Sequence, residues 1–283
     1  MSKPTALIFG AGAKGKSLLP SIQKHYDVIA FIDNDKTKWG ESVEGTSFTV
    51  RDPGTISKTD FDVVVIGTLV GLEPMTKQLL DMGISRNKID RSYVAVTIES
   101  RILFLERVGQ FFGENNISGC VAEGGVFQGE FAKEINRVFP ESKFYLFDTF
   151  TGFDARDTGI ETGKGYSQSM PGHFNITSEE LVLSKLPHPE KCVIRKGYFP
   201  ETATGIDDTF CFVNLDFDLY QPILAGLEFF IPRMASGGFI LIDDYFAEGY
   251  KGVKEAIRDY ENKHGKLNLF PIGDGNSICV LCN

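Results

Sequence analysis

A glycine turn between acidic residues is the part of this sequence with the most evident chemistry. The apolar run that ends at Glu123 is followed by Gly124, Gly125 and Gly129, and a helix is predicted to begin directly afterwards. Glycines in such a turn let the backbone approach a ligand closely and leave the first N–H groups of the helix free to bind it. A second apolar run ends at Asp148, where an α/β nucleotide site holds ribose hydroxyls. The turn therefore indicates a site for a nucleotide-like ligand.

The charge of this turn narrows the choice of ligand. Glu123 and Asp148 supply two carboxylates, and the turn itself contains no Lys or Arg that could pair with a pyrophosphate. We expect a cationic adenosyl ligand, S-adenosylmethionine, with Thr149 beside Asp148 in the same pocket. The alternative is an ordinary strand-to-helix turn, because glycine fingerprints are frequent.

More acidic residues follow two later apolar runs. Asp216 and Asp243 each end a predicted strand, and Asp244 follows at once. Active sites of parallel sheets lie beyond the carboxyl ends of the strands, where unpaired carboxylates would repel one another. A divalent cation removes that penalty, and oxygen ligands suit Mg²⁺, Mn²⁺ or Ca²⁺. We predict that these three acids hold such a cation, which could lower the pKa of a substrate hydroxyl for attack on a methyl group. Asp218 is expected instead to begin the next helix.

The elements that position these acids alternate between strands and helices. This alternation predicts a parallel sheet flanked by helices, with the last two segments as a closing antiparallel pair. A helix over Glu99–Phe112 precedes it, and residues 155–190 show no strong period and are a candidate lid. The predicted segments are Cys120–Glu123, Glu130–Val138, Phe144–Asp148, Cys192–Lys196, Phe210–Asp216, Leu219–Ile231, Phe239–Asp243, Lys251–Lys263, Leu267–Pro271 and Ser277–Leu281.

A second Rossmann-like beginning opens the chain. The strand Thr5–Phe9 runs into a GxGxxG turn with Gly10, Gly12 and Gly15, and a second strand ends at Asp33. Further segments are a strand over 61–67, a helix over 73–82 and a short strand near 92–96. We therefore predict an α/β protein with two Rossmann-like domains, at 1–97 and 98–283. The first is too short for a whole dinucleotide fold, so Gly10, Gly12, Gly15 and Asp33 are expected to hold a nucleotide or a nucleotide-linked sugar.

Composition limits the possible partners. The 283 residues carry a formal net charge of −9, with 42% hydrophobic and 24% charged residues, and no basic run is present. This acidic composition argues against a general nucleic-acid binder, because a phosphate backbone needs a concentrated basic face. No apolar stretch reaches the length of a membrane span, and the five cysteines fall mostly in apolar runs as free thiols do. We expect a cytoplasmic protein, a homo-oligomer, with small-molecule partners and no membrane or nucleic-acid partner.

Four motifs in order resemble the macrocin O-methyltransferase family. They cover about residues 99–283 and are Glu123-Gly124-Gly125 with Gly129, Phe147–Phe153, Asp216–Tyr220, and Gly237-Gly238 leading to Asp243-Asp244-Tyr245. The resemblance implies a class I, S-adenosylmethionine- and metal-dependent enzyme that methylates sugar hydroxyls. It implies that Glu123 and the glycines surround the methionine end of the cofactor, and that Asp148 binds its ribose. It also implies that Asp216, Asp243 and Asp244 hold the metal. Asp216 is similarly placed to the family's candidate base, and the sequence leaves open whether it is base, metal ligand or both.

The N-terminal segment departs from that family. Gly10–Gly15 and Phe31–Asp35 resemble the small nucleotide-sugar-binding domain of certain sugar-modifying acyltransferases. Two other functions stay open. One is an NAD(P)-dependent sugar oxidoreductase centred on Gly10–Gly15 and Asp33, which the lack of a suitably placed Tyr-x-x-x-Lys pair disfavours. The other is a nucleotide-sugar sensor without catalysis, which would not need three acids at the strand ends.

Overall fold

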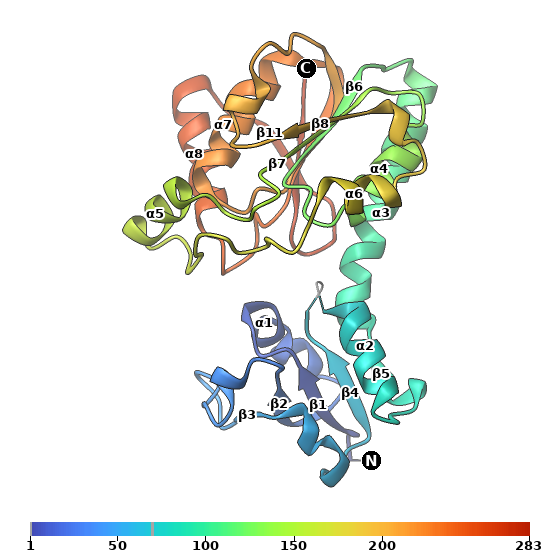
Figure 1. Ribbon diagram of the computed structural model, residues 1–283, viewed down its shortest axis with the longest axis vertical. Coiled ribbons are helices and arrows are strands. Elements are labelled where there is room, and N and C mark those ends of the chain that lie inside the picture. The colour runs from blue at the N-terminus through green and yellow to red at the C-terminus, as the bar shows by residue number, and fades with distance from the viewer. Residues whose placement is uncertain (1, 69–70) are drawn as a thin grey trace. The chain divides into compact units, whose positions relative to one another are not determined.

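The computed structural model describes residues 2–68 and 71–283, which divide into two compact units, Met1–Glu99 and Ser100–Asn283 (Figure 1). Each unit has its own sheet and its own buried core. The predicted α/β class with two Rossmann-like sheets is confirmed. Within the described residues, no helix combines the length and the apolar character needed to cross a membrane.

Unit 1 contains a parallel five-stranded sheet in the order β3-β2-β1-β4-β5. Helix α1 packs on one face through Leu19 and Ile22, and α2 packs on the other through Leu72 and Leu79. Alternating apolar residues of β1 serve both cores, as expected for a strand buried on both faces. The elements are β1 (Thr5–Phe9), α1 (Ala13–Ile22), β2 (Asp27–Ile32), β3 (Val50–Arg51), β4 (Val63–Ile66), α2 (Leu72–Asp81) and β5 (Ile89–Asp90).

The strand predicted near residues 92–96 is wrong. Ser92 instead begins the long helix α3 (Ser92–Asn115), and the last strand of unit 1 is β5. Asp90 accepts hydrogen bonds from the Ser92 N–H and hydroxyl groups, at 2.8 and 2.7 Å. This local capping outweighs the strand preference of the β-branched and aromatic residues that follow.

Unit 2 contains a seven-stranded sheet in the order β11-β12-β10-β9-β6-β7-β8. Its strands β6 to β10 are parallel, and β12 pairs antiparallel with both β10 and β11, which confirms the antiparallel closure. The strands are β6 (Cys120–Gly124), β7 (Phe144–Asp148), β8 (Cys192–Lys196), β9 (Phe210–Leu215), β10 (Met234–Ile242), β11 (Asn268–Pro271) and β12 (Ile278–Leu281).

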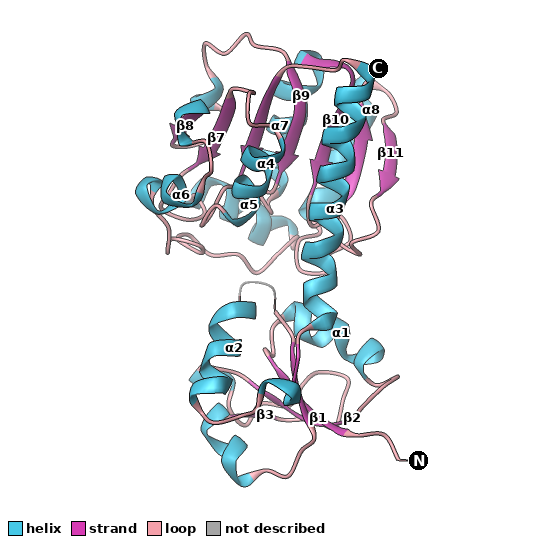
Figure 2. Ribbon diagram, turned by 90° about the vertical axis from the view of Figure 1, so that its right-hand side faces the viewer, coloured by secondary structure: helices cyan, strands magenta, loops and turns pink. Residues whose placement is uncertain are grey.

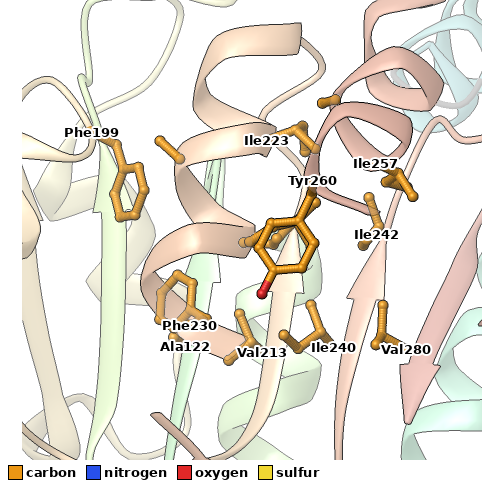
Figure 3. Close-up of a cluster of buried hydrophobic side chains, with 14 of the residues drawn as sticks. Ala122, Phe199, Val213, Ile223, Phe230, Ile240, Ile242, Ile257, Tyr260 and Val280 are labelled. Atoms are coloured by element: carbon orange, nitrogen blue, oxygen red, sulfur yellow. The ribbon is translucent and has the colours of Figure 1, made fainter. Parts of the chain in front are cut away.

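Helices cover both faces of this sheet (Figures 1 and 2). Helices α7 (Tyr220–Phe230) and α8 (Gly252–His264) pack on one face. Their Ile223, Phe230 and Ile257 meet Val213 and Ile240 of the sheet in one buried cluster (Figure 3). Helix α4 (Glu130–Val138) and the later turns of α3 pack on the other face. Six short 3₁₀ helices complete the described chain, at Lys36–Lys38, Pro53–Lys58, Arg86–Lys88, Pro189–Lys191, Glu201–Ala203 and Ile231–Arg233.

The segment without a clear period, residues 155–190, contains two helices. They are α5 (Ala155–Lys164) and α6 (Glu179–Lys185). Asp154 caps α5 by accepting from the Arg156 N–H, and Ser178 caps α6 by accepting from the Leu181 N–H. Both helices are short, so their caps were a clearer signal than their hydrophobic periodicity.

Candidate active site

The glycine turn after β6 packs directly on the end of β9. A Cβ atom at Gly125, whose φ is +82°, would lie 2.0 Å from the Asp216 carbonyl oxygen, and one at Gly124 would lie 2.2 Å from the Phe217 ring. The Asp216 N–H also donates to the Gly124 carbonyl at 2.8 Å. These glycines therefore let the predicted cofactor turn and the predicted metal ligand Asp216 lie in direct backbone contact.

Glu123 presents a buried carboxylate beside this turn. Its side chain is 2% exposed, and its Oε1 accepts from Asn214 Nδ2 at 2.9 Å on the neighbouring strand. Its Oε2 is buried and has no hydrogen-bond partner within the described part of the chain. Burial raises the pKa of Glu123 to about 8. A ligand with a positively charged donor would satisfy this oxygen.

Asp148 ties the end of β7 to the same turn. Its Oδ2 accepts from the Phe127 N–H at 2.8 Å, and its Oδ1 accepts from the Phe150 N–H at 2.6 Å. Burial raises the pKa of Asp148, and these N–H groups offset part of that rise. Thr149 donates its hydroxyl to the Gly152 carbonyl at 2.7 Å. Both residues thus shape the turn, and the carboxylate of Asp148 still has lone pairs for a ligand.

Four aspartates, Asp216, Asp218, Asp243 and Asp244, follow β9 and β10, and we call them the acid rim. Carboxylate oxygens of Asp216, Asp218 and Asp244 lie within 4.8 Å of one another, close enough to share one cation. Asp218 and Asp244 have φ of 63° and 57°, the left-handed region that turns the chain sharply at each strand end. The structure therefore brings together two of the three predicted metal ligands and adds Asp218.

Asp218 does not cap the helix that follows it. The N-cap residue of α7 is Leu219, and the Tyr220 N–H donates to Glu161 Oε1 at 2.8 Å. The expectation that Asp218 begins this helix is thus wrong, because Glu161 accepts the hydrogen bond from the first N–H group of α7. The carboxylate of Asp218 lies with the other acids of the acid rim.

Asp243 has a different environment from the rest of the acid rim. Its Oδ2 pairs with Arg101 Nη1 at 2.6 Å, and its Oδ1 accepts from Asn276 and Ser277 at 2.8 Å each. Burial alone would raise the pKa of Asp243, but the charge of Arg101 and these donors bring it below its ordinary value. Burial and neighbouring carboxylates raise the pKa of Asp216, Asp218 and Asp244. Asp243 therefore stays charged, whereas the other three compete for protons unless a cation joins them.

Arg101, Asn214 and Asn276 are polar residues of this site that the sequence did not predict. Arg101 also lies 3.3 Å from Asp216 and from the Asn214 amide oxygen. Asn276 Nδ2 donates to both Asp243 and Asp244. The sequence signal for these three residues was weak. Arg101 lies within an otherwise apolar helix, where a single charge is commonly solvated, and the two asparagines lie in a strand and in a turn.

The glycines of the N-terminal turn differ in what surrounds them. A Cβ atom at Gly15 would lie 1.9 Å from the Gly10 carbonyl oxygen, and Gly10 has φ of +112°, so folding itself requires both. A Cβ atom at Gly12 would meet nothing within 4 Å. Asp33 is buried and accepts from the Ala11 N–H at 2.7 Å and from Lys38 at 3.2 Å. Asp33 thus orders the turn, and the space above Gly12 is open.

Comparisons with known proteins agree with the fold. The family model described as Macrocin-O-methyltransferase (TylF) matches residues 71–277, and one described as C2185-like, N-terminal, matches residues 2–90. An 8-demethyl-8-(2,3-dimethoxy-alpha-L-rhamnosyl)-tetracenomycin-C 4'-O-methyltransferase of Streptomyces olivaceus is 34% identical over 83 residues, 29% of this chain and 31% of that protein.

A demethyldecarbamoylnovobiocin O-methyltransferase of Streptomyces niveus is 25% identical over 160 residues, 53% of this chain and 60% of that protein. The chain thus spans between about a third and two thirds of the length of these curated relatives. The solved structure of the O-methyltransferase NovP superposes with a TM-score of 0.56 at 20% identity, over 76% of this chain and 98% of that one. At this identity the superposition shows a shared fold.

Proposed function

The chain belongs to the macrocin O-methyltransferase family, and on that premise we propose that it transfers a methyl group from S-adenosylmethionine to a sugar hydroxyl. One observation carries the proposal: the unpartnered carboxylate oxygen of Glu123 and the three clustered aspartates lie at the carboxyl ends of adjacent parallel strands of one sheet. The first suits a cationic cofactor and the second a divalent cation. A surface glycan, a nucleotide sugar or a glycosylated natural product would be the acceptor.

Some residues of the site would bind the cofactor and the cation, and one would accept a proton. Glu123 would pair with the cationic end of the cofactor, whose sulfonium supplies the methyl group, and Asp148 with its ribose. Asp216, Asp218 and Asp244 would hold Mg²⁺ or a similar cation, which when bound polarises the acceptor hydroxyl. Asp216 would accept the hydroxyl proton as the oxygen–methyl bond forms and the sulfur–methyl bond breaks. The protein's main contribution is then positioning and charge control.

Replacing Asp148 by Ala is expected to weaken S-adenosylhomocysteine binding by about 1.5–3 kcal/mol, because charged hydrogen bonds to the ribose hydroxyls are lost. Titration calorimetry with the intact chain measures the change. Asp207, an exposed acid in unit 2, provides the control Asp207→Ala, which should bind as the wild type does. A wild-type chain that releases no heat with S-adenosylhomocysteine would overturn the cofactor assignment.

Unit 1 we propose to be a site for a nucleotide-linked sugar. Its diphosphate would lie at the start of α1 above Gly12, where Lys14 and Lys16 add positive charge. Asp33 would contribute mainly by holding the Ala11 N–H in place.

Gly12→Val is expected to abolish binding of a nucleotide-linked sugar while costing only about 1 kcal/mol of stability from the N-cap position. The reason is that a Cβ atom at Gly12 would meet no protein atom within 4 Å. Gly15→Ala is the matched comparison and should destabilise the unit strongly through the contact with Gly10. If Gly12→Val binds and turns over the nucleotide-linked sugar as the wild type does, unit 1 is not a substrate site.

One ligand screen separates this function from its rivals. A ligand at about 100 times its Kd raises the free energy of unfolding by about 2.7 kcal/mol, which a thermal shift detects. We expect S-adenosylhomocysteine to stabilise the chain. Stabilisation by NAD(P) alone would favour an oxidoreductase, and stabilisation by nucleotide sugars alone would favour a sensor.

A further inference from the structure

We propose that Arg101 is a resident counter-ion of the acid rim, which keeps unit 2 folded when no divalent cation is bound and thereby makes that cation exchangeable. This inference rests on the proposed function, because it concerns the cation at the same acids. Arg101 acts through Asp216 and Asp243 and is a positioning residue.

The guanidinium of Arg101 is fixed from several sides. The residue is 9% exposed, and Nη1 lies 2.6 Å from Asp243 Oδ2. Its Nη2 lies 3.3 Å from Asp216 Oδ2 and 3.3 Å from Asn214 Oδ1. The Phe131 ring lies 4.5 Å from the guanidinium carbon, a cation–π contact. These contacts place the positive charge of Arg101 at the acid rim, although its buried Nε has no hydrogen-bond partner among the described residues.

Charge balance gives Arg101 its role. Among the ion pairs of residues 2–68 and 71–283, Arg101 is the one cation paired with the acid rim. One positive charge set against four carboxylates compensates Asp243 and part of Asp216, and it leaves the three-acid cluster short of positive charge. The uncompensated negative charge of the three-acid cluster attracts a divalent cation, whereas the positive charge of Arg101 repels it. Removing Arg101 should therefore make the fold depend on the cation and make the cation bind more tightly.

An ordinary structural ion pair would behave differently. Its loss would lower the unfolding temperature equally with and without the cation, and it would not tighten cation binding. The two roles are therefore separable by linkage between cation binding and stability.

The test measures unfolding temperatures of the intact chain in EDTA and in MnCl₂, together with Mn²⁺ titration calorimetry. Arg101→Gln is expected to unfold roughly 10 °C below the wild type in EDTA and to recover more than half of this loss in MnCl₂. It should also bind Mn²⁺ at least about tenfold more tightly than the wild type. Arg101→Lys, which keeps the charge but loses the second nitrogen contact, should bind Mn²⁺ as the wild type does, and any loss of stability should be equal in both media.

The matched control is Arg233→Gln. Arg233 is also partly buried in unit 2, but it donates to the Phe229 carbonyl and not to the acid rim, so its loss should act equally in both media. An equal loss in both media for Arg101→Gln, or weaker Mn²⁺ binding, would overturn the inference and leave the proposed function intact. A wild-type chain that binds no Mn²⁺ would overturn the inference and the proposed cation site together, and methyl transfer itself would then be tested by the rate of S-adenosylhomocysteine formation.

A double variant keeps the test decisive if Arg101→Gln does not fold in EDTA. Arg101→Gln with Asp243→Asn removes one charge of each sign and should fold in EDTA, within a few degrees of the wild type. A double variant that also fails to fold would contradict the counter-ion role.

Discussion

Exhaustive removal of divalent cations is expected to lower the rate of methyl transfer at least about 10³-fold, and added Mg²⁺ or Mn²⁺ should restore it. The reason is the close spacing of the Asp216, Asp218 and Asp244 carboxylates, whose repulsion a cation relieves. The rate of S-adenosylhomocysteine formation after chelation and after readdition measures the effect. Full activity of the demetallated chain would refute the proposed role of the cation, and acid–base catalysis by the aspartates would be the mechanism that remains.

The same activity assay, together with Mn²⁺ titration calorimetry, resolves which acids hold the cation. Asp216→Asn should lose activity about as strongly as chelation does, without unfolding, because its carboxylate is at a strand end and only partly buried. Asp218→Asn should weaken Mn²⁺ binding if the three-acid cluster is the site, whereas Asp243→Asn should weaken it if the set predicted from sequence is right. Asp207→Asn, at an exposed position, is the control for adding an amide.

Glu123→Gln is expected to stabilise the ligand-free protein at pH 9 by roughly 3–5 kcal/mol and to weaken S-adenosylhomocysteine binding about 10–100-fold. Burial raises the pKa of Glu123 from 4.5 to about 8. The stability that its protonated form contributes is complete below pH 4.5 and is lost as the pH rises through 8, since the folded state must then hold a buried charge. Glutamine carries no such charge, and it also offers none to a cationic cofactor.

Denaturant unfolding of the wild type and Glu123→Gln at several pH values between 5 and 9 measures this difference. The gain in the free energy of unfolding should grow from pH 5 to about pH 8 and level off above it, because the other acids titrate in both proteins alike. Glu114→Gln, on the exposed face of α3, should leave the free energy of unfolding unchanged. A gain that does not depend on pH would contradict the account of Glu123.

The order and kind of the elements in unit 2 could be predicted because their signals are local. Helix α4 and strands β7 and β8 have the predicted bounds, since apolar runs and periodicity depend only on neighbouring residues. The helices α5 and α6 could not, because α5 buries the polar residues Asp157, Thr158 and Glu161 in place of an apolar stripe, and α6 has only seven residues.

The turn glycines show where prediction from sequence reaches its limit. Their spacing indicated close backbone approach, and at Gly15 and Gly125 the close partner is the protein's own backbone. Gly12, with open space around it, has the same sequence signature. Sequence alone cannot distinguish a glycine that packing requires from one that a ligand requires, because close packing and close ligand approach both exclude a side chain.

The sequence by itself determined the α/β class, the glycine turns and the presence of acids at the carboxyl ends of the strands, because each depends on residues close together in the chain. Only the tertiary structure decided which acids meet. Arg101 reaches Asp243 across 142 positions of sequence, and Glu161 takes the helix N–H group that Asp218 was expected to bind. Side-chain contacts between segments that far apart depend on how the helices and strands pack, and no local pattern encodes them.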